Sequence, residues 1–177
     1  MATSRNPIWA ELIQLIPVIS LAFPFILAGR VDLGQAGWGF LVGAILAVPI
    51  SAVVMARGKL LNPILVGAGL WLGLGAVAFQ IPVAPLADWM VRTQGFGLFV
   101  AAFLVGLVAT FFLPQGYIAC GSGDPRWIRR TSLGLLAFTA VIVAWSWIFR
   151  ANVRLGGGLP FIALNLTRRV VARRAPV

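Results

Sequence analysis

Long, uninterrupted apolar runs dominate this chain, and they do not alternate between apolar and polar positions. Continuous hydrophobicity predicts buried or lipid-facing helices and disfavours the alternating strands of a membrane barrel. Several runs reach the roughly 20 residues that a helix needs to cross the hydrocarbon of a bilayer. We therefore predict an all-α bundle with five membrane-spanning helices. Their approximate bounds are residues 8–28, 36–56, 60–81, 95–114 and 131–149.

Two further stretches are predicted to be too short for an ordinary crossing. Residues 87–92, in the connection after the third predicted span, form a candidate interfacial helix. Residues 155–167 are apolar, but at about 1.5 Å per residue they fall short of the hydrocarbon thickness. The second stretch is therefore predicted to be an interfacial, re-entrant or sixth membrane segment. A basic tail at residues 168–177 follows it, with Arg168, Arg169, Arg173 and Arg174.

The basic residues predict how the chain is oriented, because Lys and Arg concentrate on the cytoplasmic side of membrane proteins. Besides the tail, two loops carry basic clusters, one with Arg57 and Lys59 and one with Arg126, Arg129 and Arg130. The three clusters can share one side only if the C-terminal apolar segment makes a sixth crossing. Charge thus favours six crossings, whereas segment length favours five. We expect the tail to be cytoplasmic, and the side of the N-terminus stays open.

The composition agrees with an integral membrane protein. Apolar residues make up 60% of the chain, charged residues 10%, and the mean hydropathy is +0.99, whereas an ordinary soluble domain carries about 25% charged residues. The formal charge of +10 is concentrated at the ends of apolar runs and in the tail, where it would meet lipid headgroups. We therefore predict one integral membrane domain over residues 1–177, with the lipid bilayer rather than nucleic acid as its partner.

Several classes of chemistry are disfavoured by what the chain lacks. It has no histidine, the commonest metal and haem ligand and general base. Its single cysteine, Cys120, excludes an internal disulfide and a cysteine-rich metal site. No pair of carboxylates falls within the predicted spans. We therefore predict no cofactor, with bound lipid as the one candidate ligand of that kind, and we lean against an enzyme.

Small residues recur at a spacing of four in several of the predicted helices. Hydrophobic drive between helices is weak in lipid, so small residues that allow close backbone approach mark packing surfaces. The pattern fits packing within one bundle, and self-association of the chain is the alternative. The predicted packing residues are Gly39, Gly43, Gly69, Gly73, Ala102 and Gly106.

Glu11 is the acidic residue that falls within a predicted span, and Gln14 lies three positions later on the same helix face. Ionisable groups within membrane segments are functional candidates by default. Pro17 follows, and a proline leaves a backbone carbonyl without its helical partner. Glu11 and Gln14 are thus predicted ion- or ligand-binding residues lining a polar cavity. In the alternative interpretation, Glu11 lies at headgroup depth, one turn from water.

Two functions of different class fit these observations. A small transporter, or the membrane subunit of a transport system for a small solute or ion, is favoured by Glu11, Gln14 and the proline in the first span. A weak sequence similarity between residues 37–46 and 95–104 also favours a transporter, because some transporters contain internal repeats. A non-catalytic accessory subunit of a larger membrane complex is favoured by the missing catalytic groups and the small-residue faces. The first hypothesis predicts that Glu11→Gln abolishes transport, and the second that Glu11 is dispensable.

A general resemblance indicates where the protein resides. With Asn62-Pro63 opening a helix and Leu159-Pro160-Phe161 near the end, the chain resembles small bacterial inner-membrane proteins. The resemblance implies an inner-membrane location, and it implies no activity and no site residue.

Overall fold

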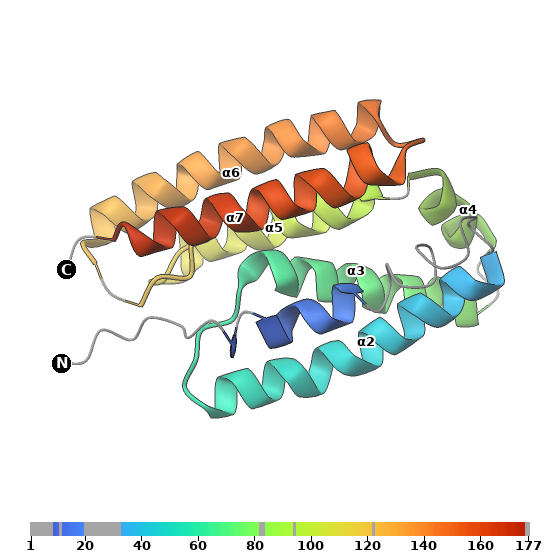
Figure 1. Ribbon diagram of the computed structural model, residues 1–177, viewed down its shortest axis with the longest axis horizontal. Coiled ribbons are helices and arrows are strands. Elements are labelled where there is room, and N and C mark those ends of the chain that lie inside the picture. Colours follow the sequence, from blue (N-terminus) through green and yellow to red (C-terminus); the bar gives the residue numbers. More distant parts are fainter. Residues whose placement is uncertain are drawn as a thin grey trace.

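The described part of the chain is all-α, as the apolar runs predict. The computed structural model describes residues 9–10, 12–19, 33–81, 84–93, 95–121 and 123–175. Regular elements within these ranges are helices (Figure 1). Residues 9–10 and 12–19 are helical and are called the N-terminal helical stretch. The elements after it are α2 (Leu33–Ala56), α3 (Pro63–Gln80), α4 (Ala84–Thr93), α5 (Gly95–Phe112), α6 (Pro125–Ile148), the π-helix η1 (Arg154–Gly158) and α7 (Leu159–Arg173).

Four of these helices are long and apolar enough to cross a membrane, so the chain is a multi-pass membrane protein with four candidate spans. The spans are residues 37–56, 63–80, 95–112 and 125–148. Each overlaps a span predicted from the sequence. Much of the first predicted span, residues 8–28, lies outside the described residues, so a fifth span is not shown. The short helix predicted at residues 87–92 is confirmed as part of α4, and its interfacial position stays a prediction.

Two of the candidate spans begin with a capping residue followed by a proline. The side chain of Asn62 accepts a hydrogen bond from the backbone N–H of Ile64 at 3.1 Å, and Asp124 accepts one from the N–H of Arg126 at 3.3 Å. Each side chain thereby satisfies one of the amide groups that the start of a helix leaves without a partner. A proline follows each cap and fits the first turn because it has no N–H. The cap at Asp124 starts α6 ahead of Thr131, where the sequence predicted it to begin.

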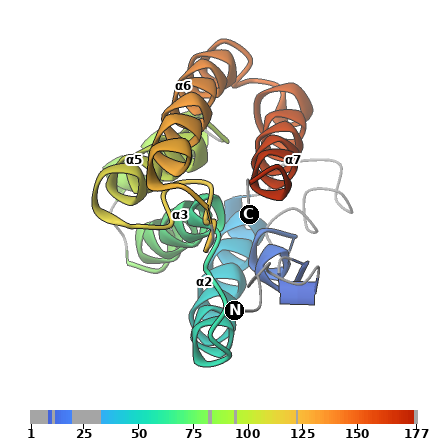
Figure 2. The same ribbon diagram turned by 90° about the vertical axis from the view of Figure 1, so that its left-hand side faces the viewer.

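The helices lie roughly along one axis, with α3 in the middle of the bundle (Figure 2). α3 packs against α2 on one side and α5 on the other, and α5 packs in turn against α6. α7 lies beside α6 and runs in the opposite direction (Figure 1). The short helix α4 lies at one end of the bundle and connects α3 to α5.

The three basic clusters lie at one end of the bundle, which we call the basic end. α2 and α7 end there and α6 begins there, on the left of Figure 1. The hairpin with Arg57 and Lys59, the first turn of α6 with Arg126 and the last turn of α7 with Arg173 therefore share one end. The same arrangement was expected from the basic residues of the sequence if the chain crosses the membrane six times. Exposed basic residues at the opposite end are Arg92, Arg150 and Arg154.

The C-terminal helix is longer than the apolar segment from which it was predicted. η1 has 5 residues and α7 has 15, and α7 follows η1 without a break. At about 1.5 Å per residue this helix is roughly 30 Å long, close to the hydrocarbon thickness of a bilayer. It extends beyond the predicted boundary at residue 167 to Arg173, because arginine is a strong helix former and continues the helix readily. The first part of the expected basic tail is therefore helical.

A close backbone approach joins α3 to α5. A Cβ atom at Gly67 would lie only 2.5 Å from the Cα atom of Ala102. The missing side chain of Gly67 thus lets the two helices pack backbone against backbone, which is how small residues stabilise helix pairs in lipid. Gly73, on the same helix, has no atom within 4 Å of the corresponding position.

We predict that Gly67→Ala lowers the free energy of unfolding by about 1–3 kcal/mol, because the added methyl group overpacks the contact between α3 and α5. Gly73→Ala is the matched control, and it should be neutral or stabilising by up to about 1 kcal/mol, because alanine favours the helix more than glycine does. Unfolding in detergent micelles, followed by tryptophan fluorescence, measures both. Equal losses of stability in the two variants would contradict the contact.

Candidate functional site

Hydrogen bonds through three residues with amide side chains link three separate elements, and we call this chain of contacts the amide seam. The Nε2 group of Gln14 donates to the carbonyl of Ala10 at 2.6 Å, and its Oε1 accepts from the backbone N–H of Asn62 at 2.9 Å. The Nδ2 group of Asn62 donates to Oδ1 of Asn165 at 3.0 Å. Asn165 in turn donates to the carbonyl of Phe161 at 3.0 Å. The seam therefore joins the N-terminal helical stretch, the start of α3 and α7.

The seam lies inside the protein rather than on its surface. Gln14 is 5% exposed and Asn62 is 3% exposed, and Asn165 is half-buried. Polar groups at such positions are costly unless they are hydrogen-bonded, because burial removes their bonds to water. Each of the three side chains meets this requirement through a neighbouring element or its own helix.

The connection between α5 and α6 folds into the bundle at residues 116–120, and we call residues 113–121 the inward loop. Ser132 of α6 accepts a hydrogen bond from the backbone N–H of Tyr117 at 3.0 Å. Arg168 of α7 donates to the carbonyl of Ile118 at 3.2 Å and is 3% exposed. Both contacts satisfy loop backbone groups that burial would otherwise leave without water. The buried residues of the loop are Gly116, Tyr117, Ile118, Ala119 and Cys120.

Arg168 connects the inward loop to the amide seam. It follows Asn165 by three positions on α7, so the two side chains lie on the same face of that helix. That face therefore carries Asn165, which bonds Asn62, and Arg168, which bonds the inward loop. The result is a polar interior near the basic end, where α3 begins and α7 ends (Figure 1).

Tyr117 fills the space between the inward loop and the helices. Its side chain is fully buried, and its ring occupies the room left by Gly106 of α5, where a Cβ atom would lie 2.7 Å from the ring. Its hydroxyl is hydrogen-bonded to the hydroxyl of Thr139 at 3.2 Å. Burial raises the pKa of Tyr117 from 10.0 to about 12, while the bond to Thr139 and the charge of Arg168 act in the opposite direction. The neutral phenol is thus the form that the fold favours.

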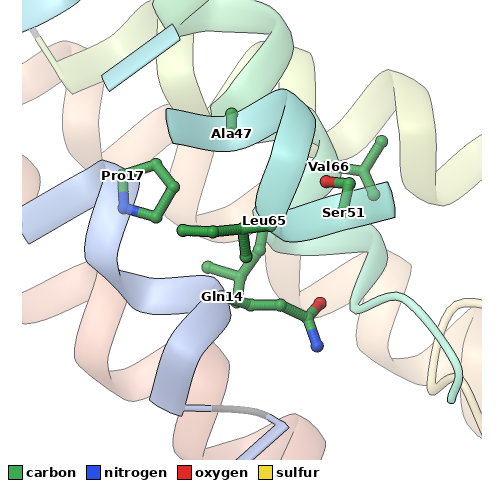
Figure 3. A pocket seen from close by; sticks show the side chains of 7 residues that line it. Gln14, Pro17, Ala47, Ser51, Leu65 and Val66 are labelled. Atoms are coloured by element: carbon green, nitrogen blue, oxygen red, sulfur yellow. The ribbon is translucent and has the colours of Figure 1, made fainter. Parts of the chain in front are cut away.

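A small pocket lies beside the seam (Figure 3). The N-terminal helical stretch contributes Gln14 and Pro17 to its lining, and α2 contributes Ser51. The remaining lining residues are Ala47, Ile50, Leu65 and Val66. The pocket has room for about one water molecule. In this arrangement it is too small for any larger solute.

The structure places the two predicted binding residues unequally. Gln14 lines the pocket, and its amide is already engaged with the carbonyl of Ala10 and the N–H of Asn62. Glu11 lies outside the described residues. The predicted Glu11–Gln14 pair therefore stays a prediction. The structure adds two residues to the candidate site, Asn62, which bonds Gln14, and Asn165, which bonds Asn62.

The predicted packing residues occupy several kinds of position. Ala102 meets Gly67, Gly106 lies beneath Tyr117, and Gly39 is buried. Gly43 faces the N-terminal helical stretch, since a Cβ atom there would lie 2.9 Å from the carbonyl oxygen of Pro17. The other two lie on α3: Gly69 is in ordinary contact with Ala47, and Gly73 faces open space.

Three residues of the site were missed by reasoning from the sequence, namely Asn165, Arg168 and Tyr117. A signal for the first two was present: Asn165 is the one amide within the apolar segment 155–167, and Arg168 follows three positions later. Their spacing places them on one helix face, but only if the helix continues past residue 167. Tyr117 carried no such signal, because a loop residue between two spans is ordinarily expected at the surface.

The chemistry of this site is that of neutral hydrogen-bond donors and acceptors, together with one guanidinium group. Amide side chains can bind polar solutes or supply oxygen ligands to a cation. Among the described residues, no three His, Cys, Asp or Glu side chains gather as metal ligands. The described part of the site is therefore equipped to form hydrogen bonds with polar groups.

Comparison with known proteins does not assign the site. No protein-family model, no curated protein and no solved structure matches this chain. Function is therefore inferred from the geometry of the amide seam and its surroundings.

We predict that the single tyrosine of the chain ionises near pH 12 in the folded protein and near pH 10 once unfolded. Tyr117 favours the folded state below pH 10, and this contribution is lost as the pH rises through the folded pKa. Tyrosinate absorbance near 295 nm reports this group alone, and the denaturant-unfolded protein is the control. Ionisation near pH 10 in the folded protein would contradict the buried position of Tyr117.

We also predict that Thr139→Val lowers the free energy of unfolding by about 1–3 kcal/mol, because it removes the hydrogen-bond partner of a buried phenol. Thr110→Val is the matched control. Both threonines are buried and donate to a carbonyl of their own helix, at 2.8 Å for Thr139 and 2.7 Å for Thr110. Chemical unfolding in detergent should show a clearly smaller loss for Thr110→Val, and equal losses would refute the role of the Tyr117–Thr139 bond.

Proposed function

We propose that this protein is a small membrane transporter, or the membrane subunit of a transport system, for a small polar solute or ion. The observation that carries the proposal is the amide seam, which brings Gln14, Asn62 and Asn165 together inside a bundle with four candidate spans. Polar groups within membrane proteins are retained at a cost and commonly mark the route of a solute or ion.

The seam does more than helix capping needs, and this supports a functional role. Oδ1 of Asn62 already caps α3 by accepting from the N–H of Ile64. Its Nδ2 group makes a second contact, to Asn165, across 103 positions of sequence. An apolar contact could hold α7 near α3 without any buried amide. A bond between two neutral amides can instead be exchanged for a bond to a polar solute at little net cost.

In this proposal, the structure is a closed form of the route. The pocket beside Gln14 holds about one water molecule. The seam joins the N-terminal helical stretch and α7 to the start of α3, near the basic end. Opening would require the bond between Asn62 and Asn165 to break, so that α7 can separate from α3. Glu11, three positions before Gln14, is the proposed charged group of the route.

The proposal includes the orientation of the chain. η1 and α7 together are long enough to form a further crossing, and this crossing would place all three basic clusters on one side. Because basic residues concentrate on the cytoplasmic side, the basic end is proposed to be cytoplasmic in a bacterial inner membrane. The closed seam would then lie at the cytoplasmic mouth of the route.

Flux through reconstituted vesicles tests the proposal. Purified protein is incorporated into liposomes of phosphatidylcholine and phosphatidylglycerol. Proton entry is followed with trapped pyranine under a potential set by valinomycin, and entry of urea and glycerol is followed by light scattering. We expect at least one probe to enter faster than in protein-free vesicles. Asn165→Ala should raise that flux about two- to tenfold, since it removes roughly one hydrogen bond from the closed form.

Two further variants complete the test. Thr110→Val alters a buried polar residue that bonds only its own helix among the contacts described, so it should leave the flux unchanged. Glu11→Gln should abolish it. If every probe enters at the rate of protein-free vesicles, transport is rejected and the accessory-subunit hypothesis replaces it. Equal effects of Asn165→Ala and Thr110→Val would reject the seam as the route.

A further inference from the structure

Exposed arginines gather at the basic end where α6 begins and α7 ends. Arg126 and Arg130 lie in the first turns of α6, and Arg173 lies in the last turn of α7; all three are exposed. α6 and α7 are in contact and run in opposite directions, so both of these ends lie at the basic end (Figure 1). Asp124, the described acidic residue beside this cluster, is engaged in capping α6.

An exposed apolar stripe continues from Arg173 along α7. Its members recur every three or four positions, so they share one face of the helix with Arg173. They are Leu159, Ile162, Leu166 and Val170, with exposed fractions of 57%, 56%, 54% and 48%. α6 repeats the pattern, with Leu133, Val141 and Ile148 exposed beyond Arg130. Each apolar stripe therefore runs along its helix to arginines at the basic end.

The apolar stripes and the arginines at their ends are complementary to a phospholipid. Apolar stripes match acyl chains, and arginines at one end of the stripes match a headgroup phosphate, which guanidinium groups bind well. A soluble anion would need the arginines without the stripes. Basic groups at the ends of membrane helices are attracted to anionic lipids, and a lipid of no net charge offers less of this attraction.

We propose that the ends of α6 and α7 bind an anionic phospholipid of the surrounding bilayer. Its phosphodiester lies against Arg126, Arg130 and Arg173, and its acyl chains lie along the stripes of the two helices. The inference is independent of the transport proposal, because it rests on the outward faces of α6 and α7 and not on the amide seam.

Lipid binding by the full chain tests the proposal. The protein is purified in a neutral detergent, and dioleoylphosphatidylglycerol or dioleoylphosphatidylcholine is added at equal concentration. Native mass spectrometry counts the bound lipids. The variant Arg126→Gln/Arg130→Gln/Arg173→Gln is compared with Arg92→Gln/Arg150→Gln/Arg154→Gln, which removes the same charge from exposed arginines at the opposite end. Thermal unfolding of both variants verifies that each is folded, and inorganic phosphate replaces lipid in a third arm.

We expect phosphatidylglycerol to bind in preference to phosphatidylcholine, and its affinity to fall at least about tenfold in the first variant. The second variant should bind as the unaltered chain does. The preference should weaken as salt is raised, because the arginines are exposed. Equal binding of the two lipids, or equal losses in both variants, would overturn the proposal. Competition by inorganic phosphate at the lipid concentration would also overturn it, since the acyl chains would then contribute nothing.

Discussion

Buried polar groups of a membrane protein must find partners within the protein, and the rest of this structure depends on that constraint. Water cannot satisfy an amide or carbonyl between packed helices, and an unsatisfied group costs several kcal/mol in hydrocarbon. The chain meets the constraint with few side chains. Asn62 caps α3 while bonding two other elements, and Ser132 accepts from the inward loop. Removing the side chain of Asn62 would take a partner from the N–H of Ile64 and from the side chain of Asn165. Removing the hydroxyl of Ser132 would take a partner from the N–H of Tyr117.

Helix packing is also governed by the lipid surroundings. Lipid is as apolar as the helix surfaces, so burying apolar side chains gives little drive for association, and close contact must supply it. α3 can lie at the centre because its neighbours come close to its backbone, as Ala102 does at Gly67. Large rings then fill the gaps that small residues leave, as Tyr117 does at Gly106. Apolar residues in the outward positions of α2 and α6 remain exposed, as expected of surfaces that meet acyl chains.

α7 combines the two chemistries of this protein on opposite faces. Its inward face carries Asn165 and Arg168, which bond Asn62 and the inward loop. Its outward face carries the apolar stripe that ends at Arg173. A movement of α7 would therefore affect the amide seam and the lipid-facing surface together. The proposed transport route and the proposed lipid site involve separate surfaces of α7. A substitution on one surface can therefore alter one site without changing the residues of the other.

The sequence by itself determined the class of fold, because the length and continuity of an apolar run depend only on local residue types. It located the four candidate spans, the short helix around Trp89 and the helix start at Asn62-Pro63. It could not determine which polar residues meet, since the partners of Asn62 lie 48 and 103 positions away. Nor could it predict that Tyr117 turns inward, because that depends on room left by Gly106 of another element. Of the packing residues predicted from spacing alone, Gly43 and Gly73 share a motif type but face a carbonyl and open space respectively. Tertiary structure decided these points, because a contact depends on the relative rotation of two helices, which neither sequence segment contains by itself.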